Sequence, residues 1–110
     1  MKFDISKYGS KHVMLCPDQE SASIFMRFLD SIGRTWCSGT SYLHRDNWNT
    51  YKRNTCYRFT EGEYCRKSYF EENHYIILNF YDFEWDELAE PTMTFEEAFY
   101  GVVSDNQTTI

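Results

Sequence analysis

Hydrophobic residues recur at helical spacing in one segment near the start of the chain. Five of them follow one another at three- and four-residue intervals: Ala22, Phe25, Met26, Leu29 and Ile32. This spacing puts the five side chains on one face of an α-helix. Pro17 precedes them at a position where proline loses no hydrogen bond, and Gly33 follows where a left-handed cap can form. The pattern therefore predicts an amphipathic helix over residues 17–32.

Short apolar runs on either side of this helix predict β-strands. Residues 12–15 form one such run, and residues 55–59 alternate between apolar and polar side chains. Residues 64–69 follow a turn at 61–63 and are interpreted as the return strand of a hairpin. Residues 75–83 give the strongest signal, with apolar side chains on both faces, which is typical of a strand that is central in its sheet or covered on both sides.

The segments between these elements show weaker patterns. Residues 35–37 and 41–43 resemble short strands. Residues 44–54 are polar, show neither helical nor strand periodicity, and are interpreted as a loop. A further turn is expected at residues 71–73.

The end of the chain completes the expected architecture. Thr94 and Glu97 have the spacing of a capping box, which predicts a short helix over residues 95–100. We expect a single domain over residues 1–103 and a disordered tail over residues 104–110. The order of elements indicates an α+β fold, with one long amphipathic helix packed on a mostly antiparallel sheet and a short C-terminal helix.

Composition indicates a folded chain and limits the cellular compartments in which it is expected. The 110 residues include nine Tyr, nine Phe and three Trp, enough large rings to build a core in a short chain. No apolar stretch approaches the roughly 20 residues that a membrane span needs. The first ten residues lack the apolar region of a signal peptide. We therefore expect a cytoplasmic protein that does not bind membranes, and whose cysteines are not oxidised.

The four cysteines are spaced in a way that leaves several interpretations open. Cys16, Cys37, Cys56 and Cys65 lack the CxxC spacing that marks most structural zinc sites. The predicted strands nevertheless bring several of them near one another, so the four thiolates are candidate ligands of a structural zinc ion. The main alternative is that they are buried free thiols, because cysteine packs like a small hydrophobic residue. A disulfide is a third alternative.

Cationic and aromatic side chains are interleaved in the predicted loop. Arg45, Lys52 and Arg53 lie there together with Trp48. Such a loop can simply remain solvated, or it can contact phosphate groups while Trp48 stacks on a base. The second interpretation makes the protein a sponge that sequesters a signalling nucleotide through residues 45–58.

Charge is divided unevenly along the chain. Residues 1–67 hold 7 acidic residues and all eleven Lys and Arg residues, a net charge of +4, whereas residues 68–110 hold 10 acidic residues and a net charge of −10. A solvated face is the ordinary explanation of such a run. Large apolar side chains are interleaved with these acids, however, and charge beside exposed rings is what a protein-binding surface needs. The candidate partner-binding residues are Glu71, Glu72, Asp82, Glu84, Trp85, Asp86, Glu87 and Glu90.

The expected partner is a protein with a basic surface. The chain has a formal net charge of −6, so direct binding of duplex DNA is not expected, because phosphate neutralisation needs clustered Lys and Arg. The sequence also lacks the HExxH motif, a phosphate-binding glycine loop and a paired-carboxylate motif. We therefore expect a binding protein rather than an enzyme.

Three stretches give the chain a resemblance of general character to known proteins. Cys16-Pro17-Asp18, Trp36-Cys37-Ser38-Gly39 and Thr55-Cys56-Tyr57, with the acidic balance and the aromatic density, look like the small orphan proteins of bacteriophages and prophages. Among these, the chain is similar to anti-CRISPR proteins that inhibit the type II effector nuclease. The resemblance implies a phage-encoded inhibitor in the host cell cytoplasm that blocks loading of nucleic acid into the basic channel of a host or defence-system protein.

Overall fold

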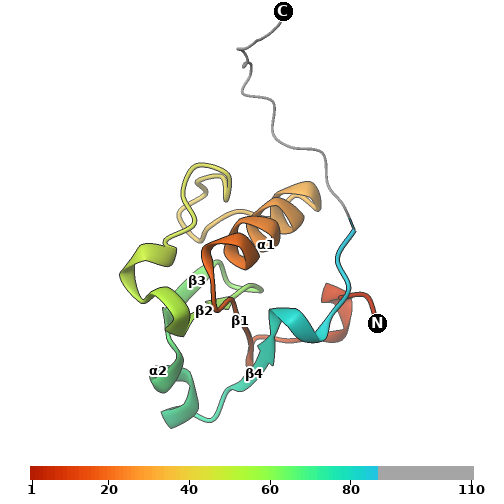
Figure 1. Ribbon diagram of the computed structural model, residues 1–110. Coiled ribbons are helices and arrows are strands. Elements are labelled where there is room, and N and C mark those ends of the chain that lie inside the picture. Colours follow the sequence, from red (N-terminus) through yellow and green to blue (C-terminus); the bar gives the residue numbers. More distant parts are fainter. Residues whose placement is uncertain (87–110) are drawn as a thin grey trace, which may run out of the picture.

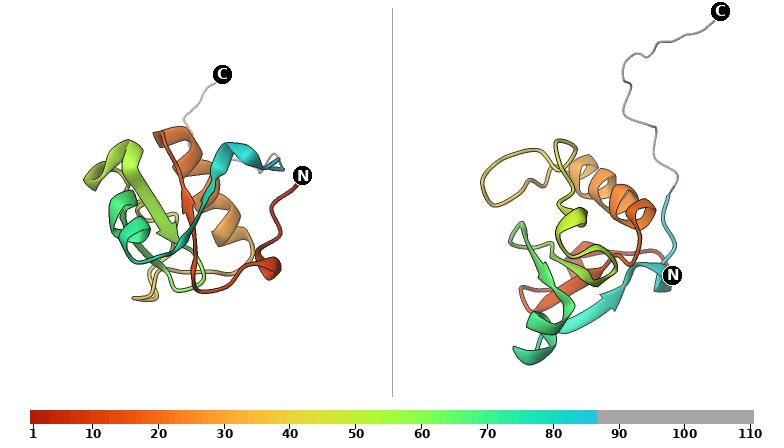
Figure 2. Two further views of the ribbon diagram at one scale, coloured as in Figure 1. Left: turned by 90° about the horizontal axis from the view of Figure 1, so that it is seen from below. Right: turned by 60° about the vertical axis from the view of Figure 1, so that its left-hand side comes forward.

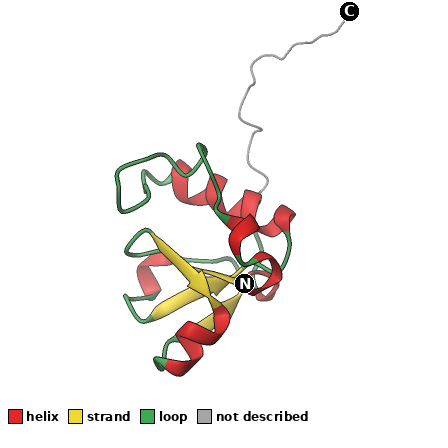
Figure 3. Cartoon of the chain, turned by 90° about the vertical axis from the view of Figure 1, so that its left-hand side faces the viewer, coloured by secondary structure: helices red, strands yellow, loops and turns green. Residues whose placement is uncertain are grey.

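A four-stranded sheet with a helix on each face forms the fold in the computed structural model, which describes residues 1–86 (Figures 1 and 3). The strands lie in the order β3-β2-β1-β4. The pairs β1–β2 and β2–β3 are antiparallel, and β1–β4 is parallel. The predicted α+β fold, with one long helix on a mostly antiparallel sheet, is confirmed. The six elements are β1 (His12–Leu15), α1 (Gln19–Ser31), β2 (Thr55–Arg58), β3 (Glu63–Arg66), α2 (Lys67–Glu72) and β4 (Ile76–Asn79).

The helix α1 lies where the apolar spacing predicts it, but it begins two residues later. Asp18 is extended and its carboxylate accepts a hydrogen bond from the main-chain N–H of Ser21 at 2.8 Å, while the hydroxyl of Ser21 accepts one from the N–H of Asp18. This reciprocal capping box fixes Asp18 as the N-cap and leaves Pro17 outside the helix. At the other end Gly33 has φ +83°, the left-handed conformation expected after the helix.

Most of the hydrophobic core lies between α1 and the sheet. Phe25 and Leu29 of α1 are fully buried against Met14 of β1 and Tyr57 of β2. Phe3, from the N-terminal segment, packs edge-on against Phe25 with ring centroids 5.9 Å apart. The periodic face of the predicted helix is therefore the face that α1 buries.

The second face of the sheet is covered by α2, where the sequence indicates a strand and a turn instead. Strand β3 ends at Arg66, and the next six residues form a helix that ends at Glu72. Phe70 of α2 is buried in a small cluster with Val13 and Cys56. A strand over residues 64–69 is therefore wrong beyond Arg66, because only the helical turn brings Phe70 onto this face.

The strand β4 is an edge strand, which corrects the interpretation of residues 75–83 as central. Within residues 1–86 it pairs with β1 alone, and Ile76 is 54 % exposed. The strand ends at Asn79, whose side chain accepts a hydrogen bond from the N–H of Tyr81 and starts a 3-10 turn over Phe80–Asp82. The apolar run continues past the strand because this turn carries Phe80 into the main core.

The long segment between α1 and β2 contains turns but no strand. Thr35 and Ser41 form a single isolated bridge, which corrects the strands predicted over residues 35–37 and 41–43. Within the predicted loop, Trp48–Thr50 and Lys52–Asn54 form 3-10 turns.

Two further observations concern membrane spanning and the extent of the described chain. None of the helices in residues 1–86 is long and apolar enough to cross a membrane. The predicted helix over residues 95–100 and the predicted tail over residues 104–110 lie outside the described residues, as does the proposed domain end at residue 103.

Candidate functional site

The fold divides the acidic candidates into two groups. Glu71 and Glu72 lie at the end of α2, before β4, whereas Asp82, Glu84 and Asp86 follow that strand. The remaining two acidic candidates, Glu87 and Glu90, lie outside the described residues. The two groups of described acids therefore lie toward opposite ends of β4 (Figure 1).

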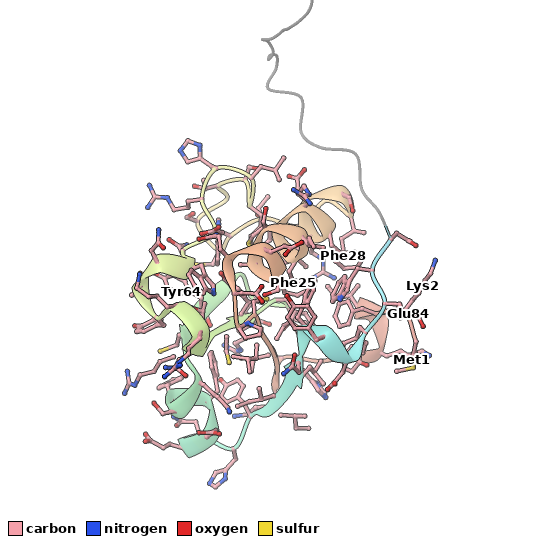
Figure 4. All side chains as sticks on the ribbon, in the orientation of Figure 1. Met1, Lys2, Phe25, Phe28, Tyr64 and Glu84 are labelled. Carbon is pink, nitrogen blue, oxygen red and sulfur yellow. The ribbon has the colours of Figure 1, made fainter. Side chains whose placement is uncertain are left out.

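The N-terminus neutralises part of the second group. The N-terminal segment lies beside residues 80–86, and Lys2 and Glu84 form a parallel bridge (Figure 2). The ammonium group of Met1 lies 3.2 Å from a carboxylate oxygen of Glu84, and Nζ of Lys2 lies 2.6 Å from a carboxylate oxygen of Asp86 (Figure 4). The hydrogen bond to Asp86 raises the pKa of Lys2. Glu84 and Asp86 have no basic neighbour in the sequence, but in the structure they pair with cations from the N-terminus.

Counting charge over the described residues locates most of the negative charge elsewhere. Residues 1–86 hold 12 acidic and 11 basic residues, a net charge of −1, whereas residues 87–110 hold five acidic residues and no basic one. The described part is therefore nearly neutral overall, and local groups of acids matter more than its total charge.

Trp85 packs against the core, which corrects the prediction that it is an exposed anchor. Its indole N–H donates to the carbonyl oxygen of Phe80 at 2.9 Å. Its ring stacks on that of Phe80, with centroids 4.5 Å apart, and lies 5.3 Å from the ring of Phe3. Trp85 therefore stabilises the segment that carries the acids.

The exposed aromatic residue of this region is Tyr81, which is 57 % exposed. Its hydroxyl donates to the carboxylate of Asp18, the N-cap of α1, at 2.7 Å. This hydrogen bond raises the pKa of Tyr81 to about 12, with Glu20 adding a smaller repulsive contribution, and it lowers the pKa of Asp18. Among residues 1–86, no cation lies within 4.0 Å of the carboxylates of Asp18, Glu20 or Asp82. We name Asp18, Glu20, Tyr81 and Asp82 the Tyr81 surface.

The four cysteines lie on different sides of the sheet. Cys16 is buried on the α1 side, Cys56 and Cys65 face α2, and Cys37 is exposed in a turn. Cys56 and Cys65 are paired across β2 and β3. Burial raises the pKa of the Cys16 thiol and raises that of Cys56 to about 12, so both are held as thiols. In the described part of the chain no group of three or more His, Cys, Asp or Glu side chains is placed to hold a metal ion, and zinc stays a prediction that elemental analysis of the purified protein tests.

The loop over residues 44–50 is fixed by aromatic side chains. The indole N–H of Trp36 donates to the carbonyl oxygen of Arg45 at 2.9 Å, and the hydroxyl of Tyr57 donates to that of Asp46 at 2.7 Å. Burial raises the pKa of Tyr57, so its hydroxyl keeps its proton. Trp48 is half-buried and donates its indole N–H to the carbonyl oxygen of Cys16 at 2.9 Å. We call residues 44–50 the anchored loop.

This anchoring changes the interpretation of the basic residues. Trp48 is half-buried and packs against the core, so only part of its ring is available for the stacking that the sequence-based hypothesis proposes. Arg58 pairs with Glu63 at 2.9 Å and lies over the ring of Tyr75. Arg45, by contrast, is exposed at the edge of two hollows.

The two hollows lie on either side of the anchored loop. One, of about 570 Å³, lies between α1 and residues 42–50. The other, of about 630 Å³, lies between two turns, at residues 36–40 and 44–47, and the start of β3 with the preceding Gly62. We name it the Arg45 hollow. His44, Arg45 and Asn47 line both.

Gly62 allows the turns around the Arg45 hollow to meet. Its φ is +73°, and a Cβ atom at this position would lie 2.5 Å from the main-chain nitrogen of Cys37. The carbonyl oxygen of Gly62 accepts a hydrogen bond from that same nitrogen at 3.0 Å. The sequence indicates Gly62 only as a turn residue and Tyr64 only as the start of a return strand, because the contacts of both join segments that are far apart in the chain.

The resemblance to anti-CRISPR proteins has no independent support. It rests on acidity, aromatic density and three short stretches of sequence, none of which specifies a fold or a site. Function must therefore be argued from the geometry of the surfaces described above. The chain matches no protein-family model, no curated protein and no solved structure.

Proposed function

We propose that this protein is a small inhibitor that binds a nucleic-acid-handling protein through an acidic, aromatic surface. One observation carries the proposal: the hydroxyl of the exposed Tyr81 bonds to Asp18, 63 residues earlier, which brings the acids at the start of α1 near the turn that carries Asp82. Asp18 and Glu20 come from the start of α1, and Asp82 from the turn after β4. Surfaces that combine an exposed aromatic ring with charge of one sign are suited to binding a partner of opposite charge.

The geometry of Tyr81 favours its use as a binding residue. Its hydroxyl is fixed by the 2.7 Å hydrogen bond to Asp18, while more than half of the side chain stays in solvent. A ring held in one orientation loses little conformational entropy when a partner covers it. Tyr81 thus takes the place that Trp85 has in the sequence-based hypothesis.

The charge of the chain favours a basic partner. The five acidic residues of 87–110 follow directly after Asp86, and the chain there contains no basic residue. Negative charge of this density steers association with a cationic surface. The channel of a type II CRISPR effector nuclease, which holds a guide–target duplex, is a surface of that kind.

A cleavage assay tests the proposal. A type II effector nuclease is mixed with the protein before guide RNA and target DNA are added, and target cleavage is measured. We expect the parent protein to inhibit cleavage and the double variant Glu20→Lys/Asp82→Lys to lose most of that inhibition, because it reverses two charges on the Tyr81 surface. Neither side chain makes a hydrogen bond or ion pair within residues 1–86, so the fold should survive.

The matched control is Glu71→Lys/Glu72→Lys, which makes the same charge change on α2. We expect this control to inhibit like the parent protein. Equal loss in both variants would show that total charge matters and that the Tyr81 surface does not, and a parent protein without inhibitory effect would refute the proposed function.

A further inference from the structure

The Arg45 hollow has the size of a small-molecule site. Its volume of about 630 Å³ falls within the range of roughly 300–1,000 Å³ that ligand pockets occupy. It lies at the opposite end of the chain's fold from the paired Met1 and Glu84, as Figure 4 shows for Tyr64, one of its lining residues. None of the residues that line it belongs to the Tyr81 surface.

The walls of the hollow are joined to one another by hydrogen bonds. In the turn at 36–40, the main-chain N–H of Trp36 donates a hydrogen bond to the carbonyl oxygen of Thr40 at 2.9 Å. This turn is bonded to residue 62 by the hydrogen bond from Cys37 to Gly62. It is bonded to the anchored loop by the hydrogen bond from the indole of Trp36. A site whose walls are already fixed binds its ligand with little ordering cost.

The polar groups around the hollow favour an anion. Arg45 and His44 supply a guanidinium and an imidazole. The hydroxyl of Ser38 donates to that of Thr40 at 3.0 Å, which leaves the Thr40 hydroxyl as a further donor. The one acidic residue among those that line it, Glu63, is engaged by the guanidinium of Arg58 at 2.9 Å. A guanidinium beside a hydroxyl donor matches the oxygen atoms of a phosphate group.

The hollow also presents aromatic side chains. Tyr64 is half-buried, and its ring packs edge-on against that of Trp36 with centroids 5.7 Å apart. Tyr51 supports the ring of Tyr64, with centroids 6.0 Å apart. An aromatic wall within reach of a phosphate-binding arginine suits a ligand that carries both a planar ring and a phosphate.

We propose that the Arg45 hollow binds a small phosphorylated ligand with a planar ring, of the nucleoside monophosphate class. Arg45 binds the phosphate, and Tyr64 contacts the base. Lys52 and Arg53, which sequence reasoning grouped with Arg45, are not among the residues that line the hollow.

Calorimetric titration with AMP, GMP, CMP, UMP and inorganic phosphate tests the assignment on the full chain. We expect at least one mononucleotide to bind, and inorganic phosphate to bind at least tenfold more weakly because it lacks the ring. Arg45→Ala should weaken mononucleotide binding at least tenfold. The loop should keep its shape in this variant, because Trp36 bonds to the carbonyl oxygen of residue 45 and not to its side chain.

Arg53→Ala is the matched control, since it removes an exposed arginine from the neighbouring 3-10 turn. It should leave affinity within twofold of the parent protein. In NMR titration the amide shifts should concentrate at residues 36–40, 44–47 and 62–64. The proposal is overturned if no mononucleotide binds at millimolar concentration, if Arg53→Ala weakens binding as much as Arg45→Ala, or if the shifts concentrate elsewhere.

Discussion

The anchored loop and the segment at residues 80–86 use the same chemistry over different distances. Each contains a 3-10 turn, and in each region a tryptophan indole donates to a main-chain carbonyl oxygen. In the loop, Trp36 reaches Arg45 from another turn and Trp48 reaches Cys16 at the end of β1. In the other segment, Trp85 reaches Phe80, only five residues away.

This difference separates two ways of positioning a surface. The loop is fixed to the core by contacts from outside itself, so its shape depends on the whole fold. Residues 80–86 are fixed by a local hydrogen bond, by stacking of Trp85 on the core, and by exposed contacts to distant segments. These are two ion pairs to the N-terminus and the hydrogen bond of Tyr81 to Asp18. Exposed pairs contribute little to stability and are screened by salt. We therefore expect the loop to be the more rigid of the two.

Replacing one tryptophan in each region should give the largest effects. Trp36→Ala removes a side chain that is only 6 % exposed, and we expect a loss of about 3–5 kcal/mol in the free energy of unfolding. Trp85→Ala removes a half-buried ring, and a loss of about 2 kcal/mol is expected. Urea denaturation followed by circular dichroism measures both. An equal or larger loss for Trp85→Ala would contradict the comparison.

Two glycine substitutions sharpen the account of how the turns meet. Gly62→Ala places a Cβ atom against the backbone of Cys37 at positive φ, so we expect a loss of more than about 1 kcal/mol. Gly39 also has positive φ, +90°, but its Cβ would meet no atom within 4 Å. Gly39→Ala should therefore cost less, since it carries the conformational strain without the clash. The urea midpoints of the two variants measure the difference, and similar losses would show that the close approach of Gly62 to Cys37 is not important.

Removing one hydroxyl from each region compares a buried with an exposed hydrogen bond. Tyr57→Phe leaves the carbonyl oxygen of Asp46 without its partner, and a loss of about 1 kcal/mol is expected. Tyr81→Phe removes a hydrogen bond at the surface, and stability should change by no more than about 0.5 kcal/mol. Thermal unfolding at one pH measures both. The comparison fails if Tyr81→Phe destabilises the protein more than Tyr57→Phe does.

The smallest effect concerns the pH dependence of the Tyr81 surface. Hydrogen bonds from Tyr81 and from the N–H of Ser21 lower the pKa of Asp18 below its ordinary value of 3.8. A carboxyl group whose pKa is lower in the folded state contributes stability above its unfolded pKa, and this contribution is lost as pH falls through the folded pKa. Asp18→Asn should therefore be less stable than the parent protein at neutral pH, and the difference should shrink as pH is lowered below 3.8. A difference in unfolding midpoint that stays constant with pH would contradict this assignment.

Sequence patterns predicted the elements whose signal is local. The periodic face of α1, the run of β1 and the alternation of β2 each arise from residues that contact one layer, and all three are found within a few residues of the expected bounds. The helix α2 was missed because its six residues place only Phe70 in the core, which is too few positions to show a helical period.

The surfaces were harder to predict than the elements. The ion pair between Lys2 and Asp86 joins residues 84 positions apart. It depends on the parallel pairing of β1 with β4, which cannot be recognised from the amino-acid pattern of either strand. The Arg45 hollow likewise depends on the approach of Gly62 to Cys37 and on the reach of Trp36. An amino-acid pattern reports which side chains face a core, but it does not report which distant turns that core brings together.

The parallel pairing of β1 with β4 has a consequence for the order of folding. His12 lies opposite Ile76, 64 residues later in the chain, whereas β2 and β3 are joined by a short turn. Closing a loop of that length is slow compared with forming a hairpin. During synthesis β1 must therefore wait for its second neighbour until about nine-tenths of residues 1–86 have been made, and one edge of β1 stays unpaired meanwhile. In this interval the nascent chain is most exposed to aggregation, and we expect co-expression with chaperones to affect its yield more than any surface substitution does.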